Sequence, residues 1–321
     1  MNITVIGCGR WGSLITWYLD HIGHRVTLYG RAASPRMQAF LTTRQNDLLT
    51  LPESVALSTA LDAALESAET VIISIGSQSL RSLLGQSELQ ALRSRTAVLC
   101  MKGLEMGTGA RLSQIAAELL HPSNTVAVWL GPGHVQEFYR GIPNCMVIDS
   151  ENEDVKRRLV QSFSSDLIRF YYGGDMIGNE VGAAAKNVVG IAAGFLDGFE
   201  MSSLKGALMS RGTREVARLI KAMGGSELSA YGLCHLGDYE ATVFSPYSHN
   251  RQFGESFVRG QDYHQLAEGY YTVKALMLLG QRYGVELPIC KAVHDILYEQ
   301  AVPRDVLAGL LRRGLTEEFY D

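Results

Sequence analysis

The sequence has no excess of positive charge, no cysteine pair at metal-ligand spacing and no uninterrupted apolar run long enough for a bilayer. Its 33 aspartates and glutamates outnumber its 29 lysines and arginines, for a formal net charge of -4. That balance offers no general attraction to nucleic acid or to an anionic lipid surface, so we expect neither as a partner. An anionic ligand must therefore be bound by a local site.

The longest apolar stretch, Val181 to Leu196, is interrupted by Lys186 and Asn187. A lysine at the centre of a membrane-spanning helix costs about 2.5–3.5 kcal/mol, so we expect no membrane insertion. The chain begins on a strand-like segment without a basic region or a small-residue cleavage site, which argues against a secretory signal. The five cysteines are scattered and form no CxxC pair, which predicts a cytoplasmic protein without a metal site.

The chain is longer than one hydrophobic core usually supports, so its 321 residues predict two domains. In the first half β-rich runs alternate with amphipathic segments, which is typical of a parallel sheet covered by helices on both faces. We expect strands at 3–6, 25–29, 70–75, 96–101, 126–130 and 144–148, and helices at 11–22, 80–92 and 111–120.

Beyond residue 175 the pattern becomes helical, with helices expected at 176–199, 205–223, 268–283 and 288–300. The predicted fold is therefore α/β: a doubly wound parallel sheet over residues 1–174, followed by an all-helical domain over residues 175–321.

A glycine motif lies directly after the first predicted strand, where Gly7, Gly9 and Gly12 match GxGxxG. Its position between a strand and an apolar-faced helix is that of a dinucleotide-binding loop in a Rossmann-type fold. Gly7 permits the tight turn, Gly9 lets a pyrophosphate approach the backbone, and Gly12 lets helix and strand pack closely. The helix N-terminus would offer free N–H groups and a partial positive charge to the phosphates.

The end of the second predicted strand favours NADP over NAD. An NAD site usually has Asp or Glu there, but no acidic residue occurs from His21 to Asn46. Arg31, with Arg36 as a possible second, could pair with a 2′-phosphate instead. The alternative for Arg31 is a solvated loop arginine.

A glycine ridge marks the first long helix of the second half. Gly182, Lys186, Gly190, Gly194 and Gly198 recur at intervals of four, so they share one helix face. Interior glycines destabilise a helix by about 0.5–1 kcal/mol each, which suggests that another backbone or a ligand comes close to this face. Lys186 lies among apolar neighbours, where desolvation would lower its pKa and favour proton donation. The alternative is a lysine that buries only its stem.

Two polar segments follow. Gly237 places the carboxylate of Asp238 on a turn, where it could orient a lysine ammonium. The stretch from Ser245 to Gly254 is rich in Ser, His, Asn and Arg, and its composition fits a polar loop or a clamp for a phosphate or hydroxyl group equally well.

Several motifs in order resemble those of the NAD(P)-dependent glycerol-3-phosphate dehydrogenases. The resemblance spans nearly the whole chain and rests on Gly7-x-Gly9-x-Trp11-Gly12, Lys102-Gly103-Leu104-Glu105, Gly131-Pro132, Glu180 with Ala185-Lys186-Asn187, Ser210-Arg211-Gly212, Leu236-Gly237-Asp238 and Asn250-Arg251-x-Phe253-Gly254. It implies interconversion of dihydroxyacetone phosphate and sn-glycerol 3-phosphate with NADP or NAD, a step that supplies glycerophospholipid synthesis. The active site is expected in the cleft between the domains, at the carboxyl ends of the strands.

The resemblance also implies residue roles. Lys186 would be the proton donor and acceptor, oriented or polarised by Asp238 and Lys102. Substrate would be held by Lys102, Gly131, Asn187, Thr242, Asn250 and Arg251. The cofactor would be bound by Gly7, Gly9, Arg10, Trp11, Gly12, Arg31, Lys102, Arg251 and Glu268.

Several departures from the family pattern keep an alternative open. His249 stands where the family usually has an arginine that helps neutralise phosphate, and Gly133 and His134 follow Gly131-Pro132 where the family has Ser or Thr and then Phe. A related NADP-dependent dehydrogenase for a different hydroxy acid or sugar phosphate is therefore the second hypothesis. A non-catalytic dinucleotide-binding sensor is the third, but it would not need Lys186 and Asp238. A homodimer is expected from the frequency of two-fold assemblies.

Overall fold

The computed structural model describes residues 1–312 and 317–318. The described residues form two compact units: a sheet unit of residues 1–101 and 112–176, and a helical unit of residues 102–111 and those from 177. The chain passes between the units three times, and the third passage, after Met176, lies close to the predicted boundary at 174–175. The sequence pattern does not predict that residues 102–111 belong to the helical unit.

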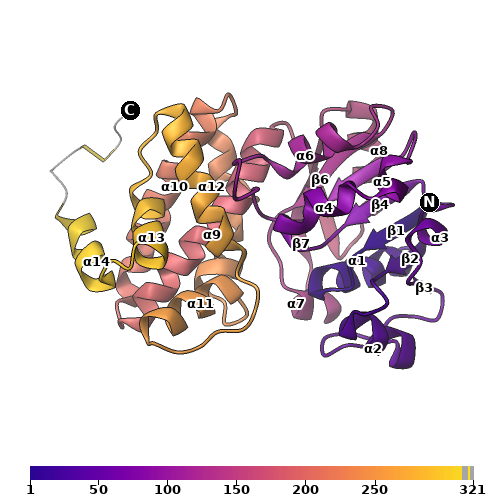
Figure 1. The fold of residues 1–321 in the computed structure, drawn as a ribbon, viewed down its shortest axis with the longest axis horizontal. Coiled ribbons are helices and arrows are strands. Elements are labelled where there is room, and N and C mark those ends of the chain that lie inside the picture. Colours follow the sequence, from indigo (N-terminus) through magenta and orange to yellow (C-terminus); the bar gives the residue numbers. More distant parts are fainter. Residues whose placement is uncertain (313–316, 319–321) are drawn as a thin grey trace. The chain divides into compact units, whose positions relative to one another are not determined.

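The sheet unit contains eight strands in the order β3-β2-β1-β4-β5-β6-β7-β8 (Figure 1). They are β1 (Asn2–Ile6), β2 (Arg25–Tyr29), β3 (Ala56–Ser58), β4 (Thr70–Ile73), β5 (Thr96–Leu99), β6 (Thr125–Leu130), β7 (Asn144–Ser150) and β8 (Ile168–Tyr172). All six predicted strands are confirmed. β3 and β8 are additional, because β3 has three residues and the edge strand β8 exposes alternate side chains, so neither is a continuous apolar run.

Helices cover both faces of the sheet. On one face, α1 (Arg10–His21), α7 (Val135–Tyr139) and α8 (Glu153–Phe163) share a hydrophobic cluster with alternate strand residues such as Val5, Ile72 and Trp129. The intervening strand residues are also buried, and α3 (Leu61–Leu65) and α6 (Leu112–Leu119) contact the sheet as well. The remaining helices of this unit are α2 (Pro35–Thr43), η1 (Ser77–Ser79), α4 (Leu80–Leu84) and α5 (Ser87–Gln90).

The predicted parallel sheet is confirmed except at one pair, where β7 runs antiparallel to β6. The connection between them, residues 131–143, is about as short as a crossover to a parallel strand can be, and its helix α7 has only five residues. The predicted helix over 80–92 is likewise two short helices, α4 and α5, interrupted at Gly85.

The loop after β1 packs against the end of β4, where the strand order reverses. Gly7 has a φ of 116°, and a Cβ there would lie 2.1 Å from the carbonyl oxygen of Ser74. A Cβ on Gly12 would lie 1.9 Å from the carbonyl oxygen of Gly7. Both glycines therefore have the steric roles predicted for a dinucleotide-binding loop.

The helical unit is built around α9 (Met176–Gly198), which is buried from Gly178 to Leu196. Its other helices are α10 (Lys205–Ala222), α11 (His249–Val258), α12 (Glu268–Tyr283), α13 (Pro288–Tyr298) and α14 (Pro303–Leu311), with the short turns η2 (Ser202–Leu204), η3 (Glu227–Tyr231), η4 (Leu236–Asp238) and η5 (Glu240–Phe244). The four predicted helices are confirmed as α9, α10, α12 and α13. Within the described residues, no helix is both long and apolar enough to cross a membrane.

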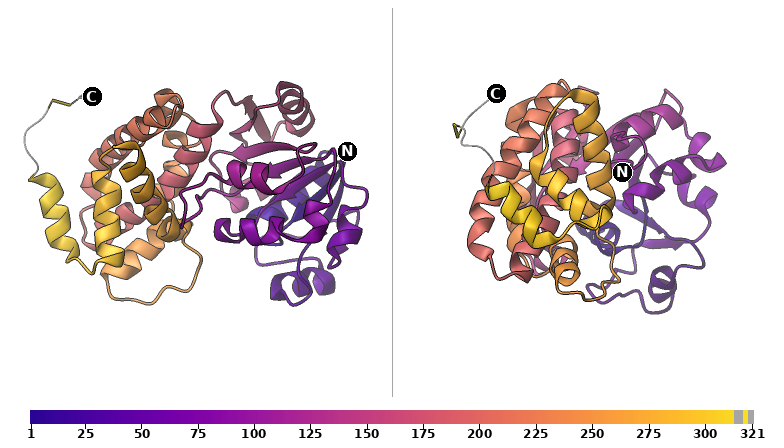
Figure 2. Two further views of the ribbon diagram at one scale, coloured as in Figure 1. Left: turned by 45° about the horizontal axis from the view of Figure 1, so that its top comes forward. Right: turned by 60° about the vertical axis from the view of Figure 1, so that its left-hand side comes forward.

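Two buried features hold this unit together. Side chains of α9 such as Val188 and Phe195 form one hydrophobic cluster with α10, α12 and α13. The helix α14, drawn in yellow at the outer edge of the helical unit in Figure 2, has no buried residue. Glu215 of α10 accepts hydrogen bonds from the N–H groups of Ile289 and Cys290 at 2.8 and 3.0 Å, so it caps α13. Burial raises the pKa of Glu215 to about 7.

The close packing of the β1–α1 loop predicts that Gly12→Ala lowers the free energy of unfolding. The added methyl group has no room beside the Gly7 carbonyl, and overpacking of this kind costs about 1–3 kcal/mol. Urea unfolding measures the effect. Gly206→Ala in α10 is the control, because a Cβ there would meet nothing within 4 Å. Equal stability of the two variants would contradict the packing argument.

Candidate functional site

Two lysines converge on a single carboxylate oxygen in the helical unit. The Nζ atoms of Lys102 and Lys186 lie 2.6 and 2.9 Å from Oδ2 of Asp238. The side chain of Asp238 is 1% exposed, that of Lys186 8% and that of Lys102 19%. The structure thus brings together the three residues predicted to be catalytic.

Three separate segments supply these groups. Lys186 lies in the middle of α9 and Asp238 ends the turn η4. Lys102 lies in the segment 102–111, which packs on the helical unit through the buried Leu104. The far end of this segment is fixed by Arg111, whose Nη1 lies 2.6 Å from Oε2 of the buried Glu180 of α9.

A chain of hydrogen bonds continues from the lysines through the predicted substrate residues. Lys186 Nζ donates to Thr242 Oγ1 at 2.6 Å, and the Thr242 hydroxyl donates to the Asp238 carbonyl at 2.7 Å. Asn187 Nδ2 donates to the Lys102 carbonyl at 2.8 Å, and its Oδ1 accepts from Asn250 Nδ2 at 3.1 Å. Asn187, Thr242 and Asn250 therefore border the lysine pair.

The ionisation of the site follows from its burial. Desolvation lowers the pKa of Lys186 to about 8, although Asp238 acts in the opposite direction. This confirms the predicted direction for Lys186. Nearby, burial lowers the pKa of His235 to about 4, so its ring is neutral at pH 7. His235 donates from Nδ1 to the Gly182 carbonyl and accepts at Nε2 from the Tyr239 hydroxyl, both at 2.8 Å.

The glycine ridge of α9 faces the chain from His235 to Val258, as the spacing predicts. A Cβ on Gly190 would lie 2.7 Å from Cγ2 of Thr242, and one on Gly194 would lie 2.1 Å from the carbonyl oxygen of Arg251. Any larger residue at these positions would push the predicted substrate residues away from Lys186. The prediction that another backbone approaches this face is confirmed.

The polar stretch after Ser245 is mainly the helix α11, not a loop. Ser248 is its N-cap and accepts a hydrogen bond from the Arg251 N–H at 3.3 Å. Nδ1 of His249 lies 2.6 Å from the hydroxyl of Tyr263.

Arg251 already has two carboxylate partners. Its Nη1 lies 2.6 Å from Oδ2 of Asp197 and 3.2 Å from Oε2 of Glu255. Its Nε donates to the Ser245 carbonyl at 3.1 Å. The substrate and cofactor role that the resemblance implies for Arg251 stays a prediction, and it competes with these pairs.

The predicted dinucleotide residues of the sheet unit fit a pyrophosphate. A Cβ on Gly9 would meet only Nη1 of Arg36, at 3.7 Å, so ligand atoms can approach the backbone there. Gly9 is the N-cap of α1 without a side-chain cap, and the first turn of the helix has no acidic residue. Arg31 is exposed just beyond β2. Arg10 and Trp11 begin α1, and the Trp11 ring lies 6.0 Å from that of Phe138.

The other predicted residues lie on both units. Gly131 follows β6 in the sheet unit with a φ of 128°, and a Cβ there would lie 3.0 Å from Cα of Met146. Glu268 is the first residue of α12, next to Gly269, whose N–H donates to Asn250 Oδ1 at 2.9 Å.

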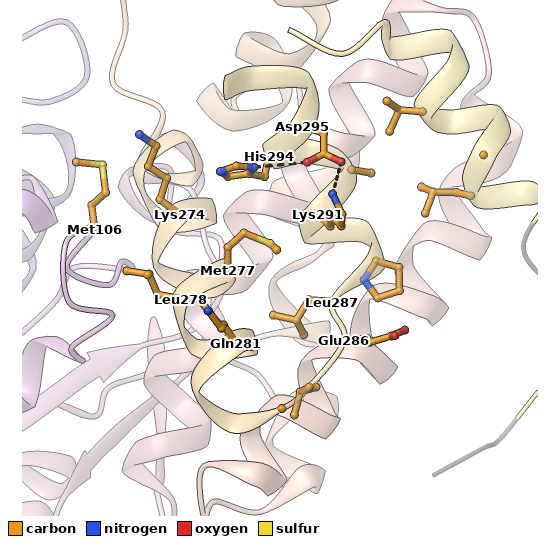
Figure 3. A pocket seen from close by; sticks show the side chains of 18 residues that line it. Met106, Lys274, Met277, Leu278, Gln281, Glu286, Leu287, Lys291, His294 and Asp295 are labelled. Carbon is orange, nitrogen blue, oxygen red and sulfur yellow. Dashed lines mark hydrogen bonds and ion pairs between the residues drawn. The ribbon is translucent and has the colours of Figure 1, made fainter. Parts of the chain in front are cut away.

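The helical unit also has a cavity of about 930 Å³ along α12, α13 and α14 (Figure 3). Figure 3 shows Lys291 and His294 directed toward Asp295, at 2.6 and 3.6 Å. None of the predicted site residues lines this cavity. Its volume alone therefore does not make it the active site.

Several polar residues around the site could not be assigned a role from the sequence. Arg111, His235, Asp197 and Lys205 are all buried or half-buried and make the contacts described above or ion pairs with one another. The sequence carries only one signal for them, which is their charge or polarity within otherwise apolar segments.

Two models of one enzyme family match most of the chain. The model described as NAD-dependent glycerol-3-phosphate dehydrogenase N-terminus matches residues 2–156, and the C-terminus model matches residues 175–308. A glycerol-3-phosphate dehydrogenase (NAD(P)+) of Prosthecochloris aestuarii is 32% identical over 99% of this chain and 100% of its own length. That of Nitrosomonas eutropha is 34% identical over 98% of each chain.

Solved structures agree with this result. The glycerol-3-phosphate dehydrogenase of Coxiella burnetii is similar with a TM-score of 0.89 and 27% identity, over 97% of this chain and 99% of that one. A 2-dehydropantoate 2-reductase of Methylococcus capsulatus shares the fold with a TM-score of 0.62 and 16% identity, over 98% and 99% of the two chains.

The lowered pKa of Lys186 predicts how the stability of the protein changes with pH. Between pH 8 and 10.5 the unfolded chain keeps the Lys186 proton that the folded chain has lost, so stability rises with pH. Relative to Lys186→Met, the wild type should gain up to about 3 kcal/mol across this window, since one pKa unit corresponds to about 1.4 kcal/mol. Urea unfolding at several pH values measures the difference. A relative loss of stability would mean that attraction to Asp238 outweighs desolvation.

Proposed function

Since this chain belongs to the NAD-dependent glycerol-3-phosphate dehydrogenase family, we propose that it interconverts dihydroxyacetone phosphate and sn-glycerol 3-phosphate by hydride transfer with NAD(P)H. The observation that carries this proposal is the cluster in which Lys186 and Lys102 share one oxygen of Asp238. The cluster holds a buried proton donor beside a second cation, as the reduction of a ketone requires. The product supplies glycerophospholipid synthesis.

Lys186 is the proton donor in the direction of ketone reduction. Its ammonium gives a proton to the carbonyl oxygen and becomes a neutral amine, and in the reverse direction the amine takes the hydroxyl proton. A pKa of about 8 makes both forms accessible near neutral pH.

Lys102 and Asp238 prepare Lys186 for this step. Lys102 provides a second cation that stabilises the negative charge that develops on the substrate oxygen. Asp238 holds both ammonium groups at one point and offsets part of the desolvation of Lys186. Asn187, Thr242 and Asn250 border this point and would bind substrate, and Gly131 is a further candidate. Arg251 is not part of this proposed substrate site, because its guanidinium is already paired with Asp197 and Glu255.

The sheet unit would hold the dinucleotide on Gly7, Gly9, Arg10, Trp11 and Gly12, with Glu268 as a candidate from the helical unit. A bound NAD(P)H would supply the hydride to the carbonyl carbon. We propose that NADP is preferred, because Arg31 is exposed beyond β2 and can pair with a 2′-phosphate. A homodimer and a cytoplasmic location remain predictions from the sequence.

Loss of the Lys186 amine should abolish most turnover. We expect Lys186→Ala to lower kcat for dihydroxyacetone phosphate by about two to four orders of magnitude, as for the loss of a general acid. NADPH oxidation followed by absorbance measures this, with Lys291→Ala, a surface lysine, as the control. If the wild type binds NADPH tightly but does not turn over dihydroxyacetone phosphate, the substrate is a different one.

Removal of the Arg31 charge should weaken NADPH binding but not NADH binding. A charge-assisted hydrogen bond contributes about 1.5–3 kcal/mol, so Arg31→Gln should raise the Kd for NADPH roughly 10- to 150-fold. Fluorescence titration of both cofactors measures the ratio. Arg25→Gln, at the opposite exposed end of β2, is the control. Equal losses for NADPH and NADH would exclude 2′-phosphate recognition by Arg31.

A further inference from the structure

Asp197 is the centre of a second ionic cluster, at the C-terminal end of α9. Its Oδ2 lies 2.6 Å from Nζ of Lys205 and 2.6 Å from Nη1 of Arg251, and its Oδ1 accepts from the Ser202 hydroxyl at 2.8 Å. The side chains of Asp197, Lys205 and Arg251 are 12%, 8% and 15% exposed. Burial raises the pKa of Asp197, but the hydrogen bonds from Lys205, Ser202 and Arg251 outweigh this and lower it. Asp197 is thus a charged group with well-defined partners.

Both cations of this cluster also bind the turn that follows Thr242. Lys205 Nζ donates to the Val243 carbonyl at 3.1 Å, and Arg251 Nε donates to the Ser245 carbonyl at 3.1 Å. One carboxylate on α9 therefore fixes two cations, and the two cations fix the backbone at residues 243–245. A planar guanidinium is well suited to this role, because it can bind a carboxylate and a carbonyl at once.

Two residues that border the lysine pair lie next to this turn or on α11. Thr242 binds Lys186 directly, and Asn250, next to Arg251 in α11, binds Asn187. The glycine ridge leaves little room for error here, since Gly194 brings α9 within van der Waals contact of the α11 backbone. Close approach allows contact but does not by itself fix the register of the two helices. The ionic cluster supplies that constraint.

We propose that Asp197 is a positioning residue that acts through Arg251 and Lys205 to hold Thr242 and Asn250 beside Lys186, and that Arg251 serves this cluster and not the phosphate of the substrate. The inference rests on the proposed function. It assigns no contact with the reacting atoms to Asp197, Arg251 or Lys205.

The variant Asp197→Asn separates this role from phosphate binding. If Arg251 bound the phosphate, loss of the competing carboxylate would leave affinity for dihydroxyacetone phosphate unchanged or improve it. If Arg251 positions the turn, loss of the carboxylate removes the ion-pair partner of Lys205 and the closer of the two carboxylate partners of Arg251, which displaces Thr242 and Asn250. A displacement of about 1 Å near a reacting group can lower the rate about 100-fold.

The experiment compares kcat and KM for dihydroxyacetone phosphate and for dihydroxyacetone, the same ketone without phosphate. It uses wild type, Asp197→Asn, Arg251→Gln, their double variant and Arg251→Lys. Lys221→Gln is the control, because Lys221 of α10 forms an exposed ion pair with Glu227 and none with the residues of the cluster. We expect Asp197→Asn and Arg251→Gln each to lower kcat roughly 10- to 100-fold with both ketones. The double variant should lose no more than the worse single one, Arg251→Lys should recover part of the rate, and Lys221→Gln should match the wild type.

Two results would overturn the inference. The first is a combined result: Arg251→Gln raises KM for dihydroxyacetone phosphate but not for dihydroxyacetone, and Asp197→Asn has the kcat of the wild type. The other is additive loss of Tm in the double variant, which would show that the two residues do not act together. Thermal unfolding also distinguishes a failure of this inference from a failure of the proposed function. Tm values test the coupling between Asp197 and Arg251 even if the wild type does not reduce dihydroxyacetone phosphate. That lack of activity would count against the proposed function alone.

Discussion

The candidate site depends on one buried carboxylate oxygen that binds two lysine ammonium groups. Oδ2 of Asp238 is the only point at which the segment 102–111, helix α9 and the turn η4 meet through charged side chains in the described part of the helical unit. Asp238 without the lysines would be a buried anion without a partner, and the two lysines without Asp238 would only repel each other. The shared carboxylate therefore allows two ammonium groups to lie close together in the interior of the unit.

The glycine ridge makes this arrangement possible. Lys186 can reach Asp238 and Thr242 only if the chain from His235 to Val258 lies directly against α9, and side chains on the ridge would hold it away. The glycines lower the intrinsic helix propensity of α9, but the packing of its remaining face in the core of the unit compensates for this loss. Packing, and not helix propensity, therefore stabilises α9, and the same packing makes it a rigid support for the proton donor.

Residues whose roles depend on local spacing were predictable from the sequence, whereas those whose roles depend on distant partners were not. The four-residue interval of Gly182, Gly190 and Gly194 predicts a close approach, and an isolated lysine in an apolar stretch predicts desolvation. The first follows from helix periodicity and the second from the apolar neighbours of Lys186. Other features depend on contacts between residues that are tens of positions apart in the sequence. They are the antiparallel strand β7, the packing of residues 102–111 in the helical unit and the ion-pair partners of Arg251. Composition and spacing do not predict these contacts, so the sequence does not distinguish an arginine or lysine in an ion pair from one that can bind phosphate.

The two ionic clusters of the helical unit differ in what their cations bind besides the shared carboxylate, and this difference accounts for their proposed roles. Lys102 and Lys186 meet at one oxygen of Asp238, and Lys186 also binds the hydroxyl of Thr242. Lys205 and Arg251 meet at one oxygen of Asp197, and each also binds a backbone carbonyl of the turn after Thr242. A cation bound to a side-chain hydroxyl can exchange that partner for a substrate oxygen without moving the backbone, whereas a cation bound to a carbonyl cannot. The partners of each cation, which only the structure shows, thus distinguish the residues that can act on substrate from those that hold them in place.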